Sequence, residues 1–153
     1  MDDKDLESAK KRSLKILGNR QMSKGDIRRR LVSKGESDEA ASEAADWLEK
    51  IGAVNDSDYA SAIVRHYCAK GYGLARVRDE LFRRGIPRDM WDAALEGAEA
   101  PEDAAFELLN KKLGGACDRD DLRRAAAMLQ RRGFSYDEAR AAVNRYVELL
   151  EEP

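Results

Sequence analysis

Side chains that carry out covalent or metal chemistry are scarce in this sequence of 153 residues. It has one histidine, His66, and two cysteines, Cys68 and Cys117, which form neither a Cys-x-x-Cys pair nor a zinc-site spacing. A G-x-x-x-x-G-K-[ST] phosphate loop is also missing. We expect His66 to be a plain surface or boundary residue, and no pair of carboxylates is marked out for acid–base work. We therefore predict no enzyme, no metal site and no cofactor.

Long apolar runs are missing as well, and aromatic residues make up only 7% of the chain. No stretch is long enough for a signal peptide or a membrane span, so we expect a cytoplasmic protein with reduced thiols. The net charge of −2 argues neither for nor against a nucleic-acid partner. Charged residues reach 38%, which is high for one compact core and typical of helices with wide solvated faces.

Apolar residues recur at helical spacing, and no convincing strand pattern occurs. Glycines, prolines and capping residues divide the chain into nine predicted helices, the first over residues Leu6 to Arg20. The start signals of the other eight are Ser23, Ser37, Asp56 or Ser57, the Gly71-Tyr72-Gly73 break, Pro87, Pro101, Asp118 and Ser135. The positions expected to be buried include Leu14, Leu17, Ile27, Leu31, Leu48, Ile51, Val77, Leu81, Phe82, Leu149 and Leu150.

A short motif, Leu-x-x-[Lys/Arg]-Gly, ends each middle helix of three successive sets of three. It begins at Leu31, Leu81 and Leu129, at offsets of 50 and 48 residues. A period near fifty predicts repeated supersecondary units, each of which needs its neighbour to complete its core. We expect an all-α, elongated array of three-helix repeats rather than a single compact bundle, which is the alternative. The predicted repeats are 1–53, 54–100 and 101–153.

Charge follows the same period, because the first two helices of each repeat are basic and the third is acidic. Residues 10–34 contain ten basic and one acidic residue, whereas residues 35–60 contain one basic and eight acidic residues. The alternation continues with net charges of +5, −7, +4 and −3 over 61–88, 89–110, 111–132 and 133–153. Stacked repeats would align these charges into a basic ridge and an acidic ridge, which suits a long charged partner. The alternative is charge balancing between adjacent helices, which needs no partner.

The central stretch carries the most specific motif. It reads Asn55-Asp56-Ser57-Asp58-Tyr59-Ala60, then Arg65, Lys70-Gly71-Tyr72-Gly73, Arg76-Val77, Glu80-Leu81 and Arg84-Gly85-Ile86. This pattern resembles the signature of the RecX family, regulators of the RecA recombinase. The flanking repeats agree with it over nearly the whole chain. The chain departs from that signature at Asn55, which replaces an acidic residue, and Gly25 stands in a predicted helix where a better helix former is expected.

The resemblance implies tandem three-helix repeats that dock in the groove of the RecA–DNA filament and modulate, mostly inhibit, its ATPase, strand-exchange and co-protease activities. Recombination and the SOS response would be damped in this way. The implied partners are RecA and its DNA filament, single- or double-stranded DNA being a possible direct partner, and we expect a monomer. The candidate contact residues are Arg65, Lys70, Tyr72, Arg76, Arg78, Arg83 and Arg84, with Arg28, Arg29 and Arg30 in support.

Two other functions remain open at this point. A basic second helix could contact nucleic-acid phosphates without any other protein. Asn or Gln at the start of a recognition helix is missing, which disfavours sequence-specific readout. The weaker alternative is a structural helical-repeat adaptor with another partner. Tyr72 is either exposed at a turn between two glycines or packed as a staple on Leu74 or Val77.

Overall fold

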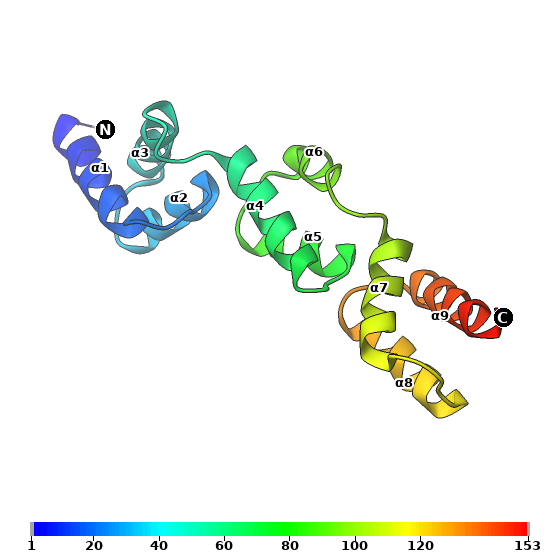
Figure 1. Cartoon of the computed structure of the whole chain (residues 1–153). Helices are drawn as coiled ribbons and strands as arrows, with labels where there is room; N and C mark the ends of the chain where they lie inside the picture. Colours follow the sequence, from blue (N-terminus) through cyan, green and yellow to red (C-terminus); the bar gives the residue numbers. More distant parts are fainter. Residues whose placement is uncertain (1, 153) are drawn as a thin grey trace. The chain divides into compact units, whose positions relative to one another are not determined.

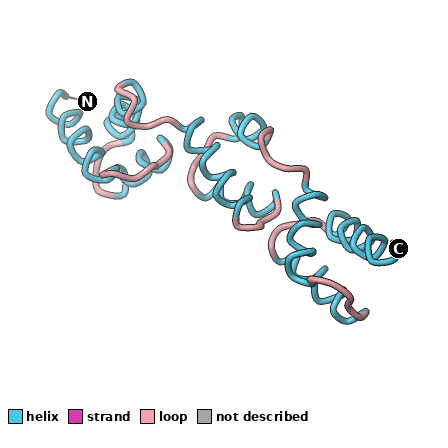
Figure 2. Tube along the Cα trace, viewed as in Figure 1, coloured by secondary structure: helices cyan, strands magenta, loops and turns pink. Residues whose placement is uncertain are grey.

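The computed structural model describes residues 2–152 (Figures 1 and 2). Across that part of the chain there are nine α-helices, one 3-10 helix and no strand, which confirms the predicted all-α class. The elements are α1 (Asp3–Leu17), α2 (Lys24–Ser33), α3 (Asp38–Lys50), α4 (Asp56–Ala69), α5 (Leu74–Arg83), η1 (Arg88–Met90), α6 (Trp91–Leu95), α7 (Pro101–Leu113), α8 (Arg119–Arg131) and α9 (Tyr136–Glu151).

Four of the predicted helix starts are confirmed by capping hydrogen bonds. The side chains of Ser23, Ser37, Asp118 and Ser135 each accept a hydrogen bond from the backbone N–H three residues further on. At the last two of these positions a reciprocal bond completes a capping box. Pro101 occupies the first turn of α7, where its missing N–H costs nothing.

The predicted start of α4 is wrong by one residue. Asn55 Oδ1, rather than Asp56 or Ser57, accepts a hydrogen bond from the Asp58 N–H at 3.0 Å. Asp56 instead turns to another helix, where its Oδ1 accepts from the Lys24 N–H at 2.9 Å. Local pattern could not separate these roles, because both side chains are good caps.

Two further boundaries differ from the predictions. α1 begins at Asp3 rather than Leu6, because Asp2 caps it by accepting from the Asp5 N–H at 2.9 Å. Pro87 precedes a single 3-10 turn, and the α-helix that follows has only five residues. The Trp91 indole donates to the Ile86 carbonyl at 3.0 Å, which holds this short helix against the end of α5.

The helices pack into two compact units. One is Met1–Ala62 with Leu81–Ala94, and the other is Ile63–Glu80 with Leu95–Pro153. Each unit therefore contains one flanking trio of helices and part of the central stretch. The division into repeats 1–53, 54–100 and 101–153 remains a prediction.

Each unit has its own hydrophobic core. In the first, α1 and α2 pack on α3 around residues that are fully buried or nearly so: Ala9, Leu17, Met22, Ile27, Leu31, Ala40, Ala41, Ala44, Leu48 and Val54. In the second, α7 and α8 pack on α9 around Ala105, Leu109, Ala125, Leu129, Phe134, Ala139, Ala142 and Tyr146. Alanine-rich positions let the helices approach closely, which explains cores with few aromatic residues.

Five residues that were expected inside the cores are exposed by 43–69%. Phe82, the most exposed at 69%, follows the fully buried Leu81 and is therefore turned about 100° away from it. Leu14 is displaced in the same way from the fully buried Ser13. The other three lie at helix ends, where an apolar stripe runs past the packed region: Ile51, Leu149 and Leu150.

Candidate interaction site in the central repeat

The glycine turn of the central motif lies against the turn between α8 and α9. The Gly73 N–H donates to the Arg132 carbonyl at 2.8 Å, and the Ala75 N–H donates to the Gly133 carbonyl at 3.3 Å. In return, the Arg132 guanidinium donates to the Lys70 carbonyl at 2.9 Å. The first amides of α5 thereby bind the last carbonyls of the α8 region, which pairs the positive end of one helix with the negative end of another.

This contact leaves no room for a side chain at either glycine. A Cβ on Gly73 would lie 2.6 Å from the Phe134 nitrogen and closer still to the Gly133 carbonyl group. A Cβ on Gly133 would lie 2.8 Å from the Arg76 backbone nitrogen, and Gly133 also has φ of +100°. The second glycine of the Gly71-Tyr72-Gly73 sequence is therefore explained by backbone packing.

Tyr72 lies in a cluster of aromatic rings and arginines beside this contact. The guanidinium carbons of Arg76 and Arg132 lie 4.8 and 5.3 Å from the centre of its ring. The Tyr67 ring is 5.8 Å from that of Tyr72 and is also approached by Arg76, at 5.6 Å. Tyr72 is thus a half-buried cation–π partner rather than a fully exposed turn residue. Arg76 Nε also pairs with Glu80 Oε1 at 3.1 Å, and Glu80 is only 5% exposed.

In the same unit, the other predicted contact residues are open to solvent. Arg65 on α4, Lys70 after α4 and Arg78 on α5 are all exposed. Long cationic side chains in this state can reach a charged partner without disturbing a core.

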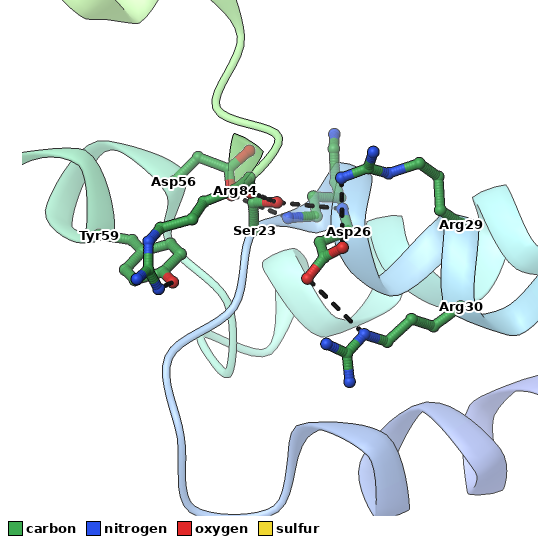
Figure 3. A network of polar contacts seen from close by, with 8 residues as sticks. Ser23, Asp26, Arg29, Arg30, Asp56, Tyr59 and Arg84 are labelled. Carbon is green, nitrogen blue, oxygen red and sulfur yellow. Dashed lines mark hydrogen bonds and ion pairs between the residues drawn. The ribbon is translucent and has the colours of Figure 1, made fainter. Parts of the chain in front are cut away.

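The first unit contains a second contact of the same kind (Figure 3). The Ser23 hydroxyl, which caps α2, also donates to the Arg84 carbonyl at the end of α5. A Cβ on Gly25 would lie 3.2 Å from the Gly85 carbonyl oxygen, and a Cβ on Gly85 would lie 2.8 Å from Ser23 Oγ. Asp56 completes the contact through its bond to the Lys24 N–H.

The remaining predicted arginines lie in the same unit as this second contact. The Arg84 guanidinium donates to the Tyr59 hydroxyl at 3.0 Å and is half-buried. Arg29 and Arg30 pair with Asp26 at 3.2 and 3.7 Å, yet their side chains are 58% and 47% exposed. Two others are exposed, one on α2 and one at the end of α5: Arg28 and Arg83.

The two contacts are equivalent within the predicted repeat. In each, the N-terminal turn of one repeat's middle helix meets the residues just before and at the marker glycine of the next: Arg84-Gly85 for α2, and Arg132-Gly133 for α5. We call these contacts the α2–α5 joint and the α5–α8 joint. The geometry therefore divides the ten predicted residues. Tyr72, Arg76 and Arg84 are half-buried at the joints or beside them, whereas the other seven are exposed.

Several residues in the joints were not predicted as site residues. Arg132 and Gly133 could have been found, because they belong to the Leu-x-x-[Lys/Arg]-Gly marker. Asp56 was interpreted only as a possible cap for its own helix. Tyr67 and Glu80 gave no signal beyond their positions in the central motif.

Two side chains at the α2–α5 joint have shifted pKa values, for different reasons. Asp56 is 4% exposed, and this desolvation raises the pKa of its carboxyl, partly offset by the hydrogen bond from the Lys24 N–H. The pKa of the Lys24 ammonium is also raised, mainly by its hydrogen bond to Asp46, at 3.1 Å.

Over the described residues, no group of His, Cys, Asp and Glu side chains could hold a metal ion. None of the helices described here is long and apolar enough to cross a membrane.

Comparison with known proteins identifies what this arrangement resembles. Models of the second and third three-helix domains of RecX match residues 55–95 and 100–143. The Regulatory protein RecX of Xanthomonas citri is 34% identical over 134 residues, covering 86% of this chain and 83% of that protein. The one from Stenotrophomonas maltophilia strain R551-3 is also 34% identical, with 86% and 82% covered.

Two solved structures share the fold. The crystal structure of RecX from Lactobacillus salivarius matches with a TM-score of 0.76 at 19% identity, covering 97% of each chain. A second crystal structure of regulatory protein RecX has a TM-score of 0.74 at 21% identity, covering 94% of this chain and 80% of that one. The all-helical repeat fold is therefore shared with both.

Proposed function

Because the chain belongs to the RecX family of regulatory proteins, we propose that it regulates the RecA recombinase by binding the RecA–DNA filament. In this proposal it mostly inhibits, acting on the ATPase, strand-exchange and co-protease activities of RecA, and so damps recombination and the SOS response. It acts as a cytoplasmic monomer, without catalysis of its own. The sequence match over 86% of the chain carries the proposal.

The candidate contact surface consists of the ten basic and aromatic residues named from the sequence, and the geometry supports different roles within it. Arg65, Lys70 and Arg78 are exposed and free of core packing, so we propose that they contact the filament directly. Arg28, Arg29, Arg30 and Arg83 are exposed in the other unit and add positive charge. Cations of this kind bind phosphates, and they also bind acidic protein surfaces.

Tyr72, Arg76 and Arg84 are assigned a different role within the same site. Their side chains pack and hydrogen-bond beside the joints, so we propose that they position the contact residues and reach the filament only through their exposed edges. Loss of one of them would then change binding together with the stability of the protein.

The direct test is the DNA-dependent ATPase of RecA on single-stranded DNA, with this protein titrated in. Inhibition well below one molecule per RecA subunit supports the proposal and indicates capping of filament ends or action at a few sites per filament. Inhibition only near equal amounts favours coating of the groove or competition for bare DNA. An unchanged ATPase rate at several molecules per subunit would contradict the proposal, because the fold alone does not establish the function.

A second candidate function is non-specific nucleic-acid binding without RecA, favoured by the exposed arginines of α2 and α5. The salt dependence of the affinity for DNA distinguishes this function from binding to RecA. A direct complex with phosphates loses affinity steeply as salt increases, with a slope set by the number of phosphates contacted. Binding to labelled single-stranded DNA at several salt concentrations, in the absence of RecA, measures this slope.

A further inference from the structure

A groove of about 370 Å³ lies between α8 and α9, within one compact unit. Its floor is aliphatic and comes from both helices: Leu122 and Ala126 from α8, and Ala139 and Val143 from α9. The floor residues are spaced four apart on each helix, so each pair lies on one face. The groove is therefore an apolar seam that α8 and α9 leave uncovered in the described chain.

Three arginines line this groove, and none of its described lining residues is acidic: Arg119 and Arg123 on α8, and Arg140 on α9. All three are exposed, and the Arg123 side chain is 75% exposed. Arg123 does approach Asp120 at 3.5 Å, but both side chains are open to water, so this pair is weak and leaves the guanidinium available. Tyr136 lines the same groove with an aromatic ring and is 63% exposed.

An aliphatic floor with arginines around it fits one kind of occupant. An amphipathic helix places apolar side chains in such a groove at spacings of three and four residues, and acidic residues beside that stripe would meet the arginines. Along α8 the lining residues run from Arg119 to Gln130, which is about 16 Å or three helical turns. A nucleic-acid strand fits less well, because strand-binding sites stack the bases on several aromatic side chains.

We propose that the α8–α9 groove is a docking site for an acidic amphipathic helix of a partner protein. The groove shares no residue with the ten candidate contact residues, so the proposal stands apart from the regulation of RecA. Apolar burial supplies affinity, and the three arginines select against basic helices of the same shape.

The test uses the full chain, labelled with ¹⁵N, and two synthetic helical peptides of about three turns. The first has leucines at positions i, i+3, i+4 and i+7 with glutamates beside them, and the second has lysines in place of the glutamates. We expect the glutamate peptide to shift the amide resonances of α8 and α9, and to bind at least about tenfold more tightly than the lysine peptide.

Charge reversal provides the decisive comparison. In the double variant Arg123→Glu with Arg140→Glu, the preference should invert, so that the lysine peptide binds more tightly than the glutamate peptide. Arg131→Glu with Lys112→Glu, exposed in the same unit but outside the groove, makes the same change in net charge. This matched control should leave both affinities within about twofold. Circular dichroism checks that the exposed substitutions leave the helices intact.

Three results would overturn the proposal. These are equal binding of the two peptides, amide shifts confined to other parts of the chain, and displacement of the glutamate peptide by a single-stranded oligonucleotide that shifts the same resonances. The last result would assign the groove to phosphates. RecA is absent from all of these measurements, so their outcome is independent of the ATPase titration.

Discussion

Gly73 and Gly133 meet backbone to backbone, so closely that a methyl group on either would collide with main-chain atoms of the other turn. Two hydrogen bonds, from the N–H groups of Gly73 and Ala75, cross this contact. The Gly71-Tyr72-Gly73 break therefore holds two helix ends together.

Replacing Gly73 by alanine should destabilise the protein by about 2 kcal/mol, in the range for overpacking against atoms that cannot move. The measurement is the free energy of unfolding in urea. Gly97→Ala is the matched control, since nothing lies within 4 Å of a Cβ there, and it should change stability by less than about 0.5 kcal/mol. Equal effects of the two substitutions would contradict the close backbone contact at the α5–α8 joint.

The ring of Tyr72 should matter more than its hydroxyl. Tyr72→Phe keeps the aromatic face under Arg76 and Arg132, so its stability should stay close to that of the wild type. Tyr72→Leu removes both cation–π contacts and should cost about 1 to 2 kcal/mol. Urea unfolding of both variants distinguishes them, and a leucine variant as stable as the phenylalanine variant would show that the stack contributes nothing.

Asp56 should give stability a specific pH dependence. The pKa of its carboxyl is raised in the folded protein by burial, so folding favours the protonated form. Its contribution is fully present below 3.8, the ordinary pKa of an aspartate side chain, and decreases as pH rises through the raised folded value. Asp56→Asn keeps an acceptor for the Lys24 N–H without the charge. Relative to the wild type, this variant should therefore gain stability as pH increases over that window.

Urea unfolding of both proteins from acidic to neutral pH measures this difference. Asp56→Ala is the control, because it removes the carboxyl and the acceptor together. It should be about 1 kcal/mol less stable than the asparagine variant at every pH, as the loss of a helix cap costs. If the difference in free energy of unfolding between the wild type and the asparagine variant does not change with pH, the pKa of Asp56 is not raised by folding.

Reversal of exposed charge should weaken regulation without unfolding the protein. Arg65→Glu with Arg78→Glu changes two solvent-exposed side chains, so helical content should be unchanged. The concentration needed for half-inhibition of the RecA ATPase should rise about tenfold or more, as expected when two charged contacts become repulsive. Lys50→Glu with Lys112→Glu, also exposed but outside the candidate site, makes the same change in net charge. If both double variants inhibit equally, only overall charge matters and the assigned patch is wrong.

Much of the fold was accessible from the sequence, because helix caps and apolar spacing are local signals. Ser23, Ser37, Asp118 and Ser135 cap the helices that they were predicted to start. Phe82 was assigned to the core because residues adjacent in sequence are hard to separate by periodicity alone. One position on a helix is a rotation of about 100°, and that rotation decides between burial and exposure.

The candidate site was harder to predict, because its geometry depends on residues about sixty positions apart. Gly25 is unexpected in a helix when only its neighbours are considered, and it is explained by the Gly85 carbonyl oxygen 3.2 Å from where its Cβ would be. Arg76 and Arg78 are similar in sequence context, yet Arg76 packs on two tyrosines and pairs with Glu80, while Arg78 is exposed. Helical spacing cannot reveal which of them a distant turn covers.

Asn55 and Asp56 are adjacent, yet their side chains accept hydrogen bonds from the first turns of two different helices, α4 and α2. The length of the loop between α3 and α4 is therefore constrained by the contact between Asp56 and Lys24, and not only by the conformation of the loop itself. One residue added to that loop would have to be absorbed without moving Asp56, since any shift would separate its carboxylate from the Lys24 N–H. We infer that natural variation in length should be rare between Ile51 and Asn55.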